Sequence, residues 1–178
     1  MNKTKILTWE ITGAFIISIL GTLFHYVFAF FDEWPPVALI AAVNESVWEH
    51  LKLAFWPALI YAFIESSFLH KHTKNFWTAK TFGIFSMPII ITSFFYGYTS
   101  FIGRNILWVD ISLFVFAVFS GQMISYGLLL RRSFAAGTKI LAVILLVLMI
   151  AAFSLFTFLP PHHPLFRDAP TGQYGILR

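Results

Sequence analysis

Five long apolar segments, each almost free of charged side chains, follow one another along the chain of 178 residues. They lie at about residues 9–31, 44–69, 81–102, 106–130 and 138–159. A helix needs roughly 20 apolar residues to cross the hydrocarbon core of a bilayer, so each segment is long enough to span it. Unpaired backbone groups are costly in lipid, which makes helices the expected form. The sequence therefore predicts an all-α polytopic membrane bundle, with about five transmembrane helices in a single domain covering residues 1–178.

The composition agrees with membrane insertion. Hydrophobic residues make up 58% of the chain and charged residues 11%, whereas about a quarter of a typical soluble domain is charged. The chain has no cysteine, which excludes disulfides, thiolate metal sites and cysteine nucleophiles. The formal net charge of +4 comes from basic residues scattered at segment ends, so it does not indicate a nucleic-acid partner. The expected partner is the lipid bilayer.

Prolines divide the apolar segments from the rest of the chain. Pro35 and Pro36 end the first predicted helix, because consecutive prolines do not continue a helix. Residues 37–43 are too few to cross the bilayer, so they are predicted to form a short re-entrant or interfacial segment. Pro160 and Pro161 end the fifth helix, and the tail at residues 160–178 is too rich in proline and glycine for a sixth crossing.

The distribution of charge predicts an orientation. Five crossings place most of the basic residues on one side of the membrane, namely Lys3, Lys5, Lys71, Lys74, Lys80, Arg131, Arg132 and Lys139. The opposite side keeps Lys52, Arg104, Arg167 and Arg178, together with six of the eight acidic residues. By the positive-inside rule, the N-terminus is expected to be cytoplasmic and the tail extracytoplasmic, in the plasma membrane.

This topology brings several histidines and carboxylates to the same outer level of the bundle. They are His25, Glu45, Glu49, His50, Asp110, His162 and His163. Polar groups near hydrocarbon need partners or a function. Ligands of these types converging from different helices suit zinc or another divalent metal with an open position for water. The predicted ligands are His25, His50, Asp110, His162 and His163, with Glu45 or Glu49 as the catalytic general base.

Each member of this set also has a simpler explanation. Ser46 and Glu49 have the spacing of a capping box, in which Glu49 bonds a backbone N–H at the helix start. His50 points about 100° away from Glu49 around a helix, so the two are not expected to address one point. Asp110 suits the first turn of a helix, where it complements the helix dipole. Of the adjacent His162 and His163, at most one is expected to enter a shared pocket.

The sequence thus leaves two classes of function open. The first is a metal-dependent membrane hydrolase or transferase that acts at the outer leaflet on a lipid or lipid-linked substrate. The second is a non-enzymatic membrane protein: a carrier for a metal or small solute, or a helical subunit that binds another membrane protein. A carrier needs a polar path to the inner side, where the sequence offers few ionisable residues beyond Glu10 and Glu65.

Several stretches carry a resemblance to a known family. They are residues 44–53 and 55–57, the Phe-Tyr-Gly-Tyr-Thr run at 95–99, the Pro-Pro-His run at 160–162 and the Thr-Gly-Gln-Tyr-Gly run at 171–175. Over essentially its whole length the chain resembles a family of small multi-pass prokaryotic membrane proteins of unknown function, which implies a fold and a location but no reaction. It is also faintly similar to alkaline ceramidases and related membrane hydrolases, which hold zinc with His, Asp and Ser from several helices. The chain departs from that superfamily in having about five crossings rather than seven and in lacking paired histidines within a final helix.

Overall fold

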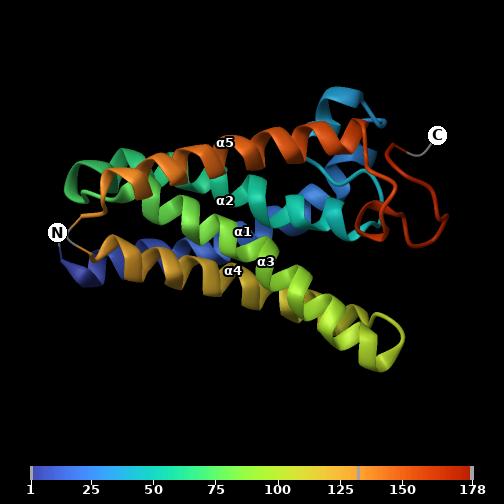
Figure 1. The fold of residues 1–178 in the computed structure, drawn as a ribbon, viewed down its shortest axis with the longest axis horizontal. Coiled ribbons are helices and arrows are strands. Elements are labelled where there is room, and N and C mark those ends of the chain that lie inside the picture. Colours follow the sequence, from blue (N-terminus) through green and yellow to red (C-terminus); the bar gives the residue numbers. More distant parts are fainter. Residues whose placement is uncertain (1, 132, 177–178) are drawn as a thin grey trace.

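The computed structural model describes residues 2–131 and 133–176, which fold into five long helices packed side by side (Figure 1). These helices are α1 (Lys3–Phe30), α2 (Val47–Leu69), α3 (Phe76–Ile102), α4 (Leu107–Leu129) and α5 (Ala136–Phe158). All five are long and apolar enough to cross a membrane. The prediction of an all-α polytopic bundle with about five transmembrane helices is confirmed.

Three short 3-10 helices complete the described elements: η1 (Pro35–Leu39), η2 (His70–His72) and η3 (Pro164–Phe166). The first of them overlaps the interfacial segment predicted at residues 37–43 but begins two residues earlier. Its two N-terminal residues are the consecutive prolines, whose fixed φ angles suit the first turn of a helix. With only five residues, η1 is far too short to cross the bilayer.

Helices α1 and α3 start well before their apolar segments predict, and α5 starts slightly earlier, at Ala136 rather than near residue 138. The side chain of Asn2 accepts a hydrogen bond of 3.1 Å from the amide of Thr4, and this cap starts α1 at Lys3 rather than near residue 9. Helix α3 starts at Phe76 rather than near residue 81. Residue Lys80 consequently lies within α3 and is buried, although the sequence places it among the basic residues of the inner loop.

Helix α2 is the most buried of the five spans, and α5 is the least. Aromatic side chains fill the space between these two helices. The ring of Phe153 from α5 stacks on Phe55 at a centroid distance of 4.7 Å and on Trp48 at 4.6 Å. Such large rings bury much apolar area at a single contact. The first three turns of α2 are thereby packed against α5 within the bundle.

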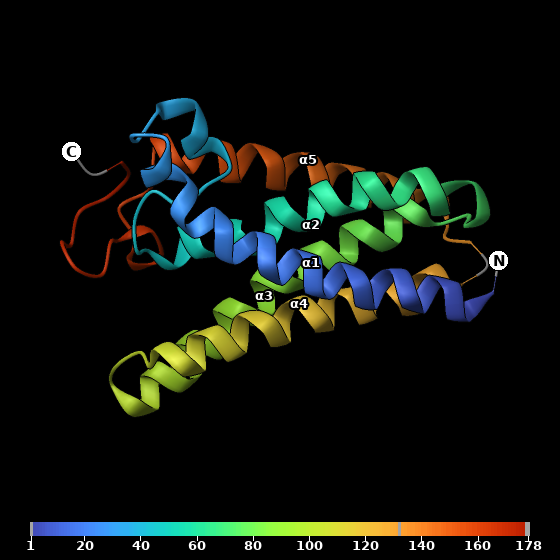
Figure 2. The same ribbon diagram turned by 180° about the vertical axis from the view of Figure 1, so that it is seen from behind.

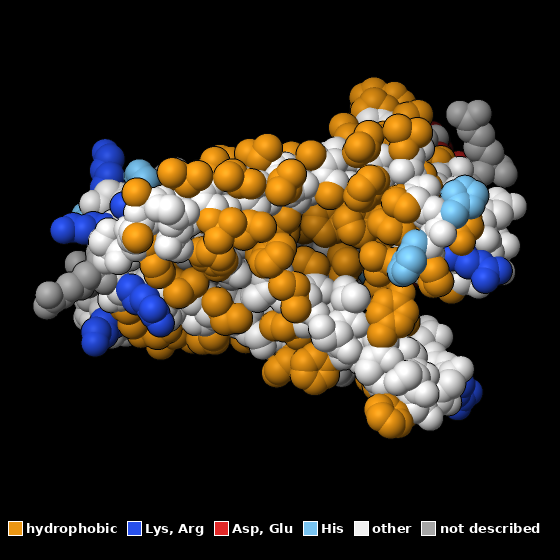
Figure 3. Space-filling model, viewed as in Figure 1, with side chains coloured by type: hydrophobic (Ala, Val, Ile, Leu, Met, Phe, Trp, Pro, Cys, Tyr) orange, Lys and Arg blue, Asp and Glu red, His pale blue; other side chains and the backbone are white. Residues whose placement is uncertain are grey.

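The surface of the bundle has the polarity of a membrane protein. Apolar side chains cover its length, while lysines and arginines gather at its ends (Figure 3). The N-terminus and the connections α2–α3 and α4–α5 lie at one end, here called the basic end. The C-terminal residues 160–176 lie at the opposite end, here called the tail end, as the reverse view also shows (Figure 2). Arg132 and Arg178, which enter the predicted charge asymmetry, lie outside the described residues.

Candidate functional site

The loop that precedes α2 carries Glu45, and its backbone is held from within the loop. The side chain of Asn44 accepts a hydrogen bond of 2.9 Å from the amide of Ser46. Ser46 is the N-cap of α2, and its hydroxyl accepts a hydrogen bond of 3.3 Å from the amide of Glu49. Asn44 and Ser46 are buried, whereas Glu45 between them is exposed. The cap therefore fixes the backbone and leaves the Glu45 carboxylate free to face its neighbours.

The C-terminal tail fastens the same loop from outside. The amide of Glu45 donates a hydrogen bond of 2.8 Å to Asp168, and the side-chain amide of Asn44 donates one of 2.8 Å to the carbonyl of Gly175. Burial alone raises the pKa of Asp168, but hydrogen bonds from the hydroxyl and amide of Thr171 and from the amide of Glu45 outweigh burial and lower this pKa below its usual value. Asp168 is thus an ionised anchor for the loop.

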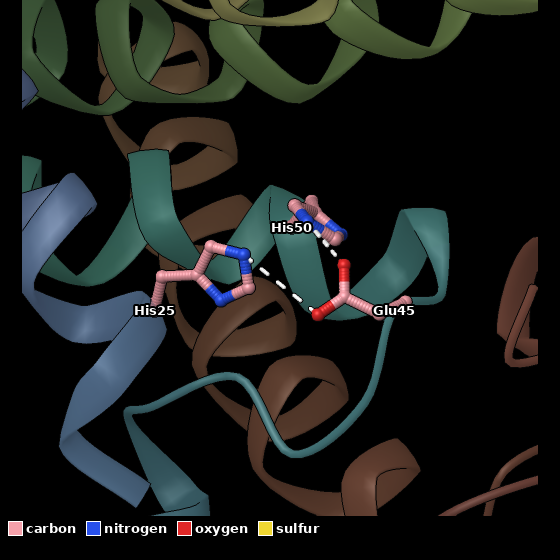
Figure 4. Close-up of side chains that lie close together, drawn as sticks. All are labelled: His25, Glu45 and His50. Atoms are coloured by element: carbon pink, nitrogen blue, oxygen red, sulfur yellow. Dashed lines mark ion pairs between the residues drawn. The ribbon is translucent and has the colours of Figure 1, made fainter. Parts of the chain in front are cut away.

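Two histidines flank the Glu45 carboxylate (Figure 4). The Nε2 atom of His25, from α1, lies 3.8 Å from one carboxylate oxygen, and the Nε2 atom of His50, from the first turn of α2, lies 3.5 Å from the other. The centroids of the two imidazole rings are 5.1 Å apart. One ligand atom from each residue falls within 4.8 Å of the others, so the three side chains form a compact ligand set.

The second ring nitrogen of His50 determines what its Nε2 atom presents to Glu45. Its Nδ1 atom lies 2.8 Å from the carbonyl oxygen of Ser46. A carbonyl oxygen only accepts hydrogen bonds, so Nδ1 carries the proton and a neutral His50 presents a lone pair at Nε2. A lone pair facing a carboxylate oxygen is repulsive unless a proton or a metal cation lies between them. Metal-bound histidines commonly donate a hydrogen bond from their other ring nitrogen to a backbone carbonyl, as His50 does here.

The set is accessible from the surface of the protein. The side chains of His25, His50 and Glu45 are 32%, 35% and 49% exposed. Two imidazoles and one carboxylate leave at least one coordination position of a tetrahedral ion open. This partial exposure gives water or a substrate group a route to that position.

The other predicted metal ligands lie elsewhere. Asp110 accepts hydrogen bonds from the hydroxyl of Tyr98 and from Asn105, at the turn between α3 and α4. At the tail end the hairpin of α3 and α4 diverges from the rest of the bundle (Figures 1 and 2). Asp110, in the first turn of α4, is not part of the group that contains His25. Among the described residues, the group of His and carboxylate side chains close enough to share an ion consists of His25, Glu45 and His50.

The two histidines of the tail are exposed and have local partners. The ring of His162 stacks on that of Tyr174 at a centroid distance of 4.7 Å. The Nδ1 atom of His163 accepts a hydrogen bond of 3.2 Å from the amide of Leu165 and caps η3. Neither ring belongs to the ligand set around Glu45.

Glu49, the second predicted general base, is buried in an ion pair. Its carboxylate lies 2.8 Å from the Nζ atom of Lys52 and accepts a hydrogen bond of 2.9 Å from the hydroxyl of Thr157 on α5. The Glu49 carboxylate accepts a hydrogen bond from the amide of Val43 rather than from that of Ser46. Of the predicted capping box, only the hydrogen bond from the amide of Glu49 to the hydroxyl of Ser46 is therefore present. As the helical geometry predicts, the side chains of Glu49 and His50 point in different directions, toward Lys52 and Glu45 respectively. Glu45 is the carboxylate that meets the histidines.

Sequence reasoning missed two buried lysines. The charge distribution along the sequence predicts that Lys52 and Lys80 lie near span ends as topology signals, yet both are buried and paired with carboxylates. The spacing of Glu49 and Lys52 on one helix face is a local signal for the first pair. The second pair joins Lys80 to Glu10 and Glu65, and their common position near the inner ends of three spans is the available signal.

The fold and this site define a multi-pass membrane protein of the lipid bilayer, with a cluster of two histidines and one glutamate at the tail end. Its sequence matches the model of a family of unknown function (DUF6512) over residues 1–176, so the chain belongs to this family. No curated protein and no solved structure matches the chain. The resemblance to an uncharacterised membrane-protein family is thereby confirmed.

Proposed function

We propose that His25, Glu45 and His50 bind a divalent metal ion and that the protein is a metal-dependent hydrolase or transferase of the membrane surface. The observation that carries this proposal is the orientation of the two Nε2 atoms toward one carboxylate, with His50 held by the carbonyl of Ser46. A cation between these three groups removes the repulsion between lone pairs. Zinc is the first candidate because imidazole and carboxylate are both ordinary zinc ligands.

The geometry needs only small adjustments to hold such an ion. Zinc bonds of about 2.0–2.1 Å place tetrahedral ligands roughly 3.4 Å apart, while the ligand atoms here lie within 4.8 Å of one another. The side chains are partly exposed, so rotation about their χ angles closes this difference without moving a helix. Metal-bound water at the open position would have a pKa near 7 and would supply the nucleophile.

The location of the cluster supports a lipid or lipid-linked substrate. His25 lies near the C-terminal end of α1 and His50 in the first turn of α2, where both spans leave the apolar layer. A lipid head group occupies this level when its acyl chains lie against the apolar sides of the bundle. The basic residues gather mainly at the opposite end. By the positive-inside rule, this distribution supports a position of the cluster at the outer leaflet of the plasma membrane.

A carrier function has less support from the interior of the bundle. Between Lys52 and Glu65, the buried positions of α2 are almost all apolar, from Leu53 to Ala62, with Tyr61 as the one residue that carries a polar atom. The hydroxyl of Tyr61 is itself bonded to the carbonyl of Trp9. A polar path from one end to the other would have to cross this packed layer, which favours chemistry at the surface over passage through the bundle.

Metal binding by purified protein tests the proposal. After treatment with a chelator, the protein is titrated with Zn²⁺, Mn²⁺ and Co²⁺, and the bound metal is measured by elemental analysis and calorimetry. We expect one ion per chain, with loss of binding in His25→Ala, Glu45→Gln and His50→Ala. His162→Ala is the matched control, because this histidine is exposed and lies outside the cluster. Absence of stoichiometric metal in the unmodified chain would contradict the proposal.

Catalysis is tested separately from binding. The protein is reconstituted into vesicles of mixed phospholipids and lipid-linked phosphates, and released head groups are followed by mass spectrometry with and without metal. Metal-dependent product formation that is lost in His50→Ala supports an enzyme. Metal binding without any product from these lipids would favour the non-enzymatic alternative.

A further inference from the structure

A second group of ionisable side chains lies inside the bundle toward the basic end. The Nζ atom of Lys80 (α3) lies 2.6 Å from a carboxylate oxygen of Glu10 (α1) and also contacts the carboxylate of Glu65 (α2). Ser125 (α4) donates a hydrogen bond of 2.9 Å to the same oxygen of Glu10. All four residues are buried, Glu10 and Glu65 completely. The cluster therefore joins four helices at one point in the interior of the bundle.

The charges within this cluster do not balance. Two carboxylates face one ammonium group, which leaves one negative charge in excess if both carboxylates are ionised. Oxygen Oε2 of Glu10 and oxygen Oε1 of Glu65 have no hydrogen-bond donor. An unpaired buried charge is strongly unfavourable, so this arrangement favours a positively charged or hydrogen-bond-donating ligand.

The surrounding residues do not supply this charge. The hydroxyl of Tyr61 (α2) donates to the backbone carbonyl of Trp9, and the side-chain amide of Gln122 (α4) donates to the backbone carbonyl of Glu10 at 3.4 Å. Both side chains come from helices that contribute to the cluster with Glu10, Glu65, Lys80 and Ser125. Nothing among them donates to the two free carboxylate oxygens.

We propose that this cluster is a proton-binding site, in which Glu10 and Glu65 together hold one proton beside Lys80. One proton neutralises the excess negative charge. It also allows one carboxyl group to donate a hydrogen bond to a carboxylate oxygen. A sodium ion fits less well because the ammonium group of Lys80 already touches both carboxylates and would repel it. This site is separate from the cluster of His25, Glu45 and His50.

The packing next to the cluster also favours the smallest cation. A Cβ atom added at Gly13, one turn along α1 from Glu10, would lie 2.3 Å from the side-chain amide of Gln122 and 2.4 Å from the ring of Tyr61. Helices α1, α2 and α4 therefore meet here without spare volume. A hydrated or multiply coordinated ion needs room that this contact does not leave.

The position of the site indicates the side with which its proton exchanges. Glu10 follows Lys5 by five residues, which is about 7.5 Å along a helix. Glu65 lies four residues before the end of α2 and Lys80 four residues after the start of α3. The cluster thus lies one to two turns from the basic end, while the apolar layer around Phe55, Ala58 and Leu59 separates it from the tail end. Exchange with the aqueous phase at the basic end is the shorter route.

Isosteric substitutions with infrared detection test this proposal. A protonated carboxyl group gives a C=O stretching band distinct from that of a carboxylate, and we expect this band at neutral pH in the unmodified protein. Either Glu10→Gln or Glu65→Gln should remove it while the bundle stays folded, because glutamine replaces the protonated partner without adding charge. Glu33→Gln, in the exposed loop after α1, is the matched control and should leave the band unchanged.

The double variant and the choice of salt complete the test. Glu10→Gln combined with Glu65→Gln leaves Lys80 buried without a counter-charge, so we expect a much lower yield of folded protein than for either single change. If a single variant does not fold, the band of the unmodified protein is followed across pH in hydrogen and deuterium oxide. A missing band at neutral pH, or a band unchanged in both single variants, overturns the proposal. The proposal is also overturned if Na⁺, but not choline, raises the stability of the folded protein in a saturable way and this effect is lost in Glu65→Gln.

Discussion

The amide of Glu45 donates a hydrogen bond of 2.8 Å to Oδ1 of Asp168, which lies 123 residues further along the chain. This contact joins the loop before α2 to the C-terminal tail, at the residue whose carboxylate faces His25 and His50. The tail is therefore part of the support of the candidate metal site. The tail supplies none of the three candidate ligands, yet it fixes the backbone of Glu45, which is one of them.

Replacing Asp168 by alanine should loosen this support. The variant loses the acceptor of hydrogen bonds from Glu45 and Thr171 and leaves the Glu45 amide without a partner. Hydrogen bonds to charged groups contribute roughly 1.5–3 kcal/mol each, so we expect a lower thermal midpoint in detergent and faster hydrogen exchange at the amide of Glu45. Gln173→Ala, in the same tail with an exposed side chain, is the control. Unchanged exchange at Glu45 in the Asp168 variant would contradict this role.

Acid should detach the tail at a pH set by Asp168. Its pKa in the folded protein is lowered, because hydrogen bonds from Thr171 and Glu45 outweigh the effect of burial. The stabilisation is therefore present above the unfolded-state pKa of about 3.9 and is lost as the pH falls through the lower folded-state pKa. Pepsin, which is active in acid, should cleave the tail only below this window. In Asp168→Asn, tail cleavage should no longer change with pH over this range. If cleavage of the unmodified chain does not depend on pH, Asp168 does not control the release of the tail.

The level of a residue along the bundle axis could be read from the sequence, but its position around the axis could not. Counting crossings placed His25, His50, Glu45 and Asp110 at one level, and three of them do meet. Asp110 does not, because the α3–α4 hairpin diverges at the tail end (Figure 1). That divergence depends on how whole helices pack, which no local spacing encodes.

The burial of the lysines also could not be predicted from the sequence. A lysine near the end of an apolar segment is typical of the membrane interface, and the sequence offers no local reason to place Lys80 inside the bundle. Its partners Glu10 and Glu65 are 70 and 15 residues away along the chain. Burial of such a charge depends on counter-charges from other helices, so the sequence indicates only that the three residues share a level near the inner ends of their spans.

Removing Lys52 alone should be more damaging than removing its whole ion pair. Lys52→Met leaves the buried carboxylate of Glu49 without its counter-charge. Breaking one side of a buried pair costs roughly 3–5 kcal/mol, so we expect a large fall in the free energy of unfolding. Adding Glu49→Gln should recover much of this loss, because the double variant buries no charge at this position. Denaturant titrations of the two single variants and the double variant in micelles measure the coupling. Additive losses would show that the two charges do not depend on each other.

A close contact between two glycines should make the α3–α4 interface sensitive to a single methyl group. A Cβ atom added at Gly121 of α4 would lie 2.7 Å from the backbone carbonyl of Gly83 on α3 and 2.6 Å from Met87. A backbone carbonyl cannot move aside as the end of a flexible side chain can, so Gly121→Ala has to separate the two helices. We expect a loss of about 1–3 kcal/mol in the free energy of unfolding.

Gly127→Ala is the matched control for this change on the same helix. A Cβ atom there meets no atom within 4 Å, and alanine is favoured over glycine within a helix by roughly 0.5–1 kcal/mol. The two substitutions add the same methyl group to α4, so they should shift stability in opposite directions. Thermal unfolding of both variants in the same detergent, followed by circular dichroism, measures this contrast. Equal midpoints for Gly121→Ala and Gly127→Ala would mean that α3 and α4 do not approach each other this closely.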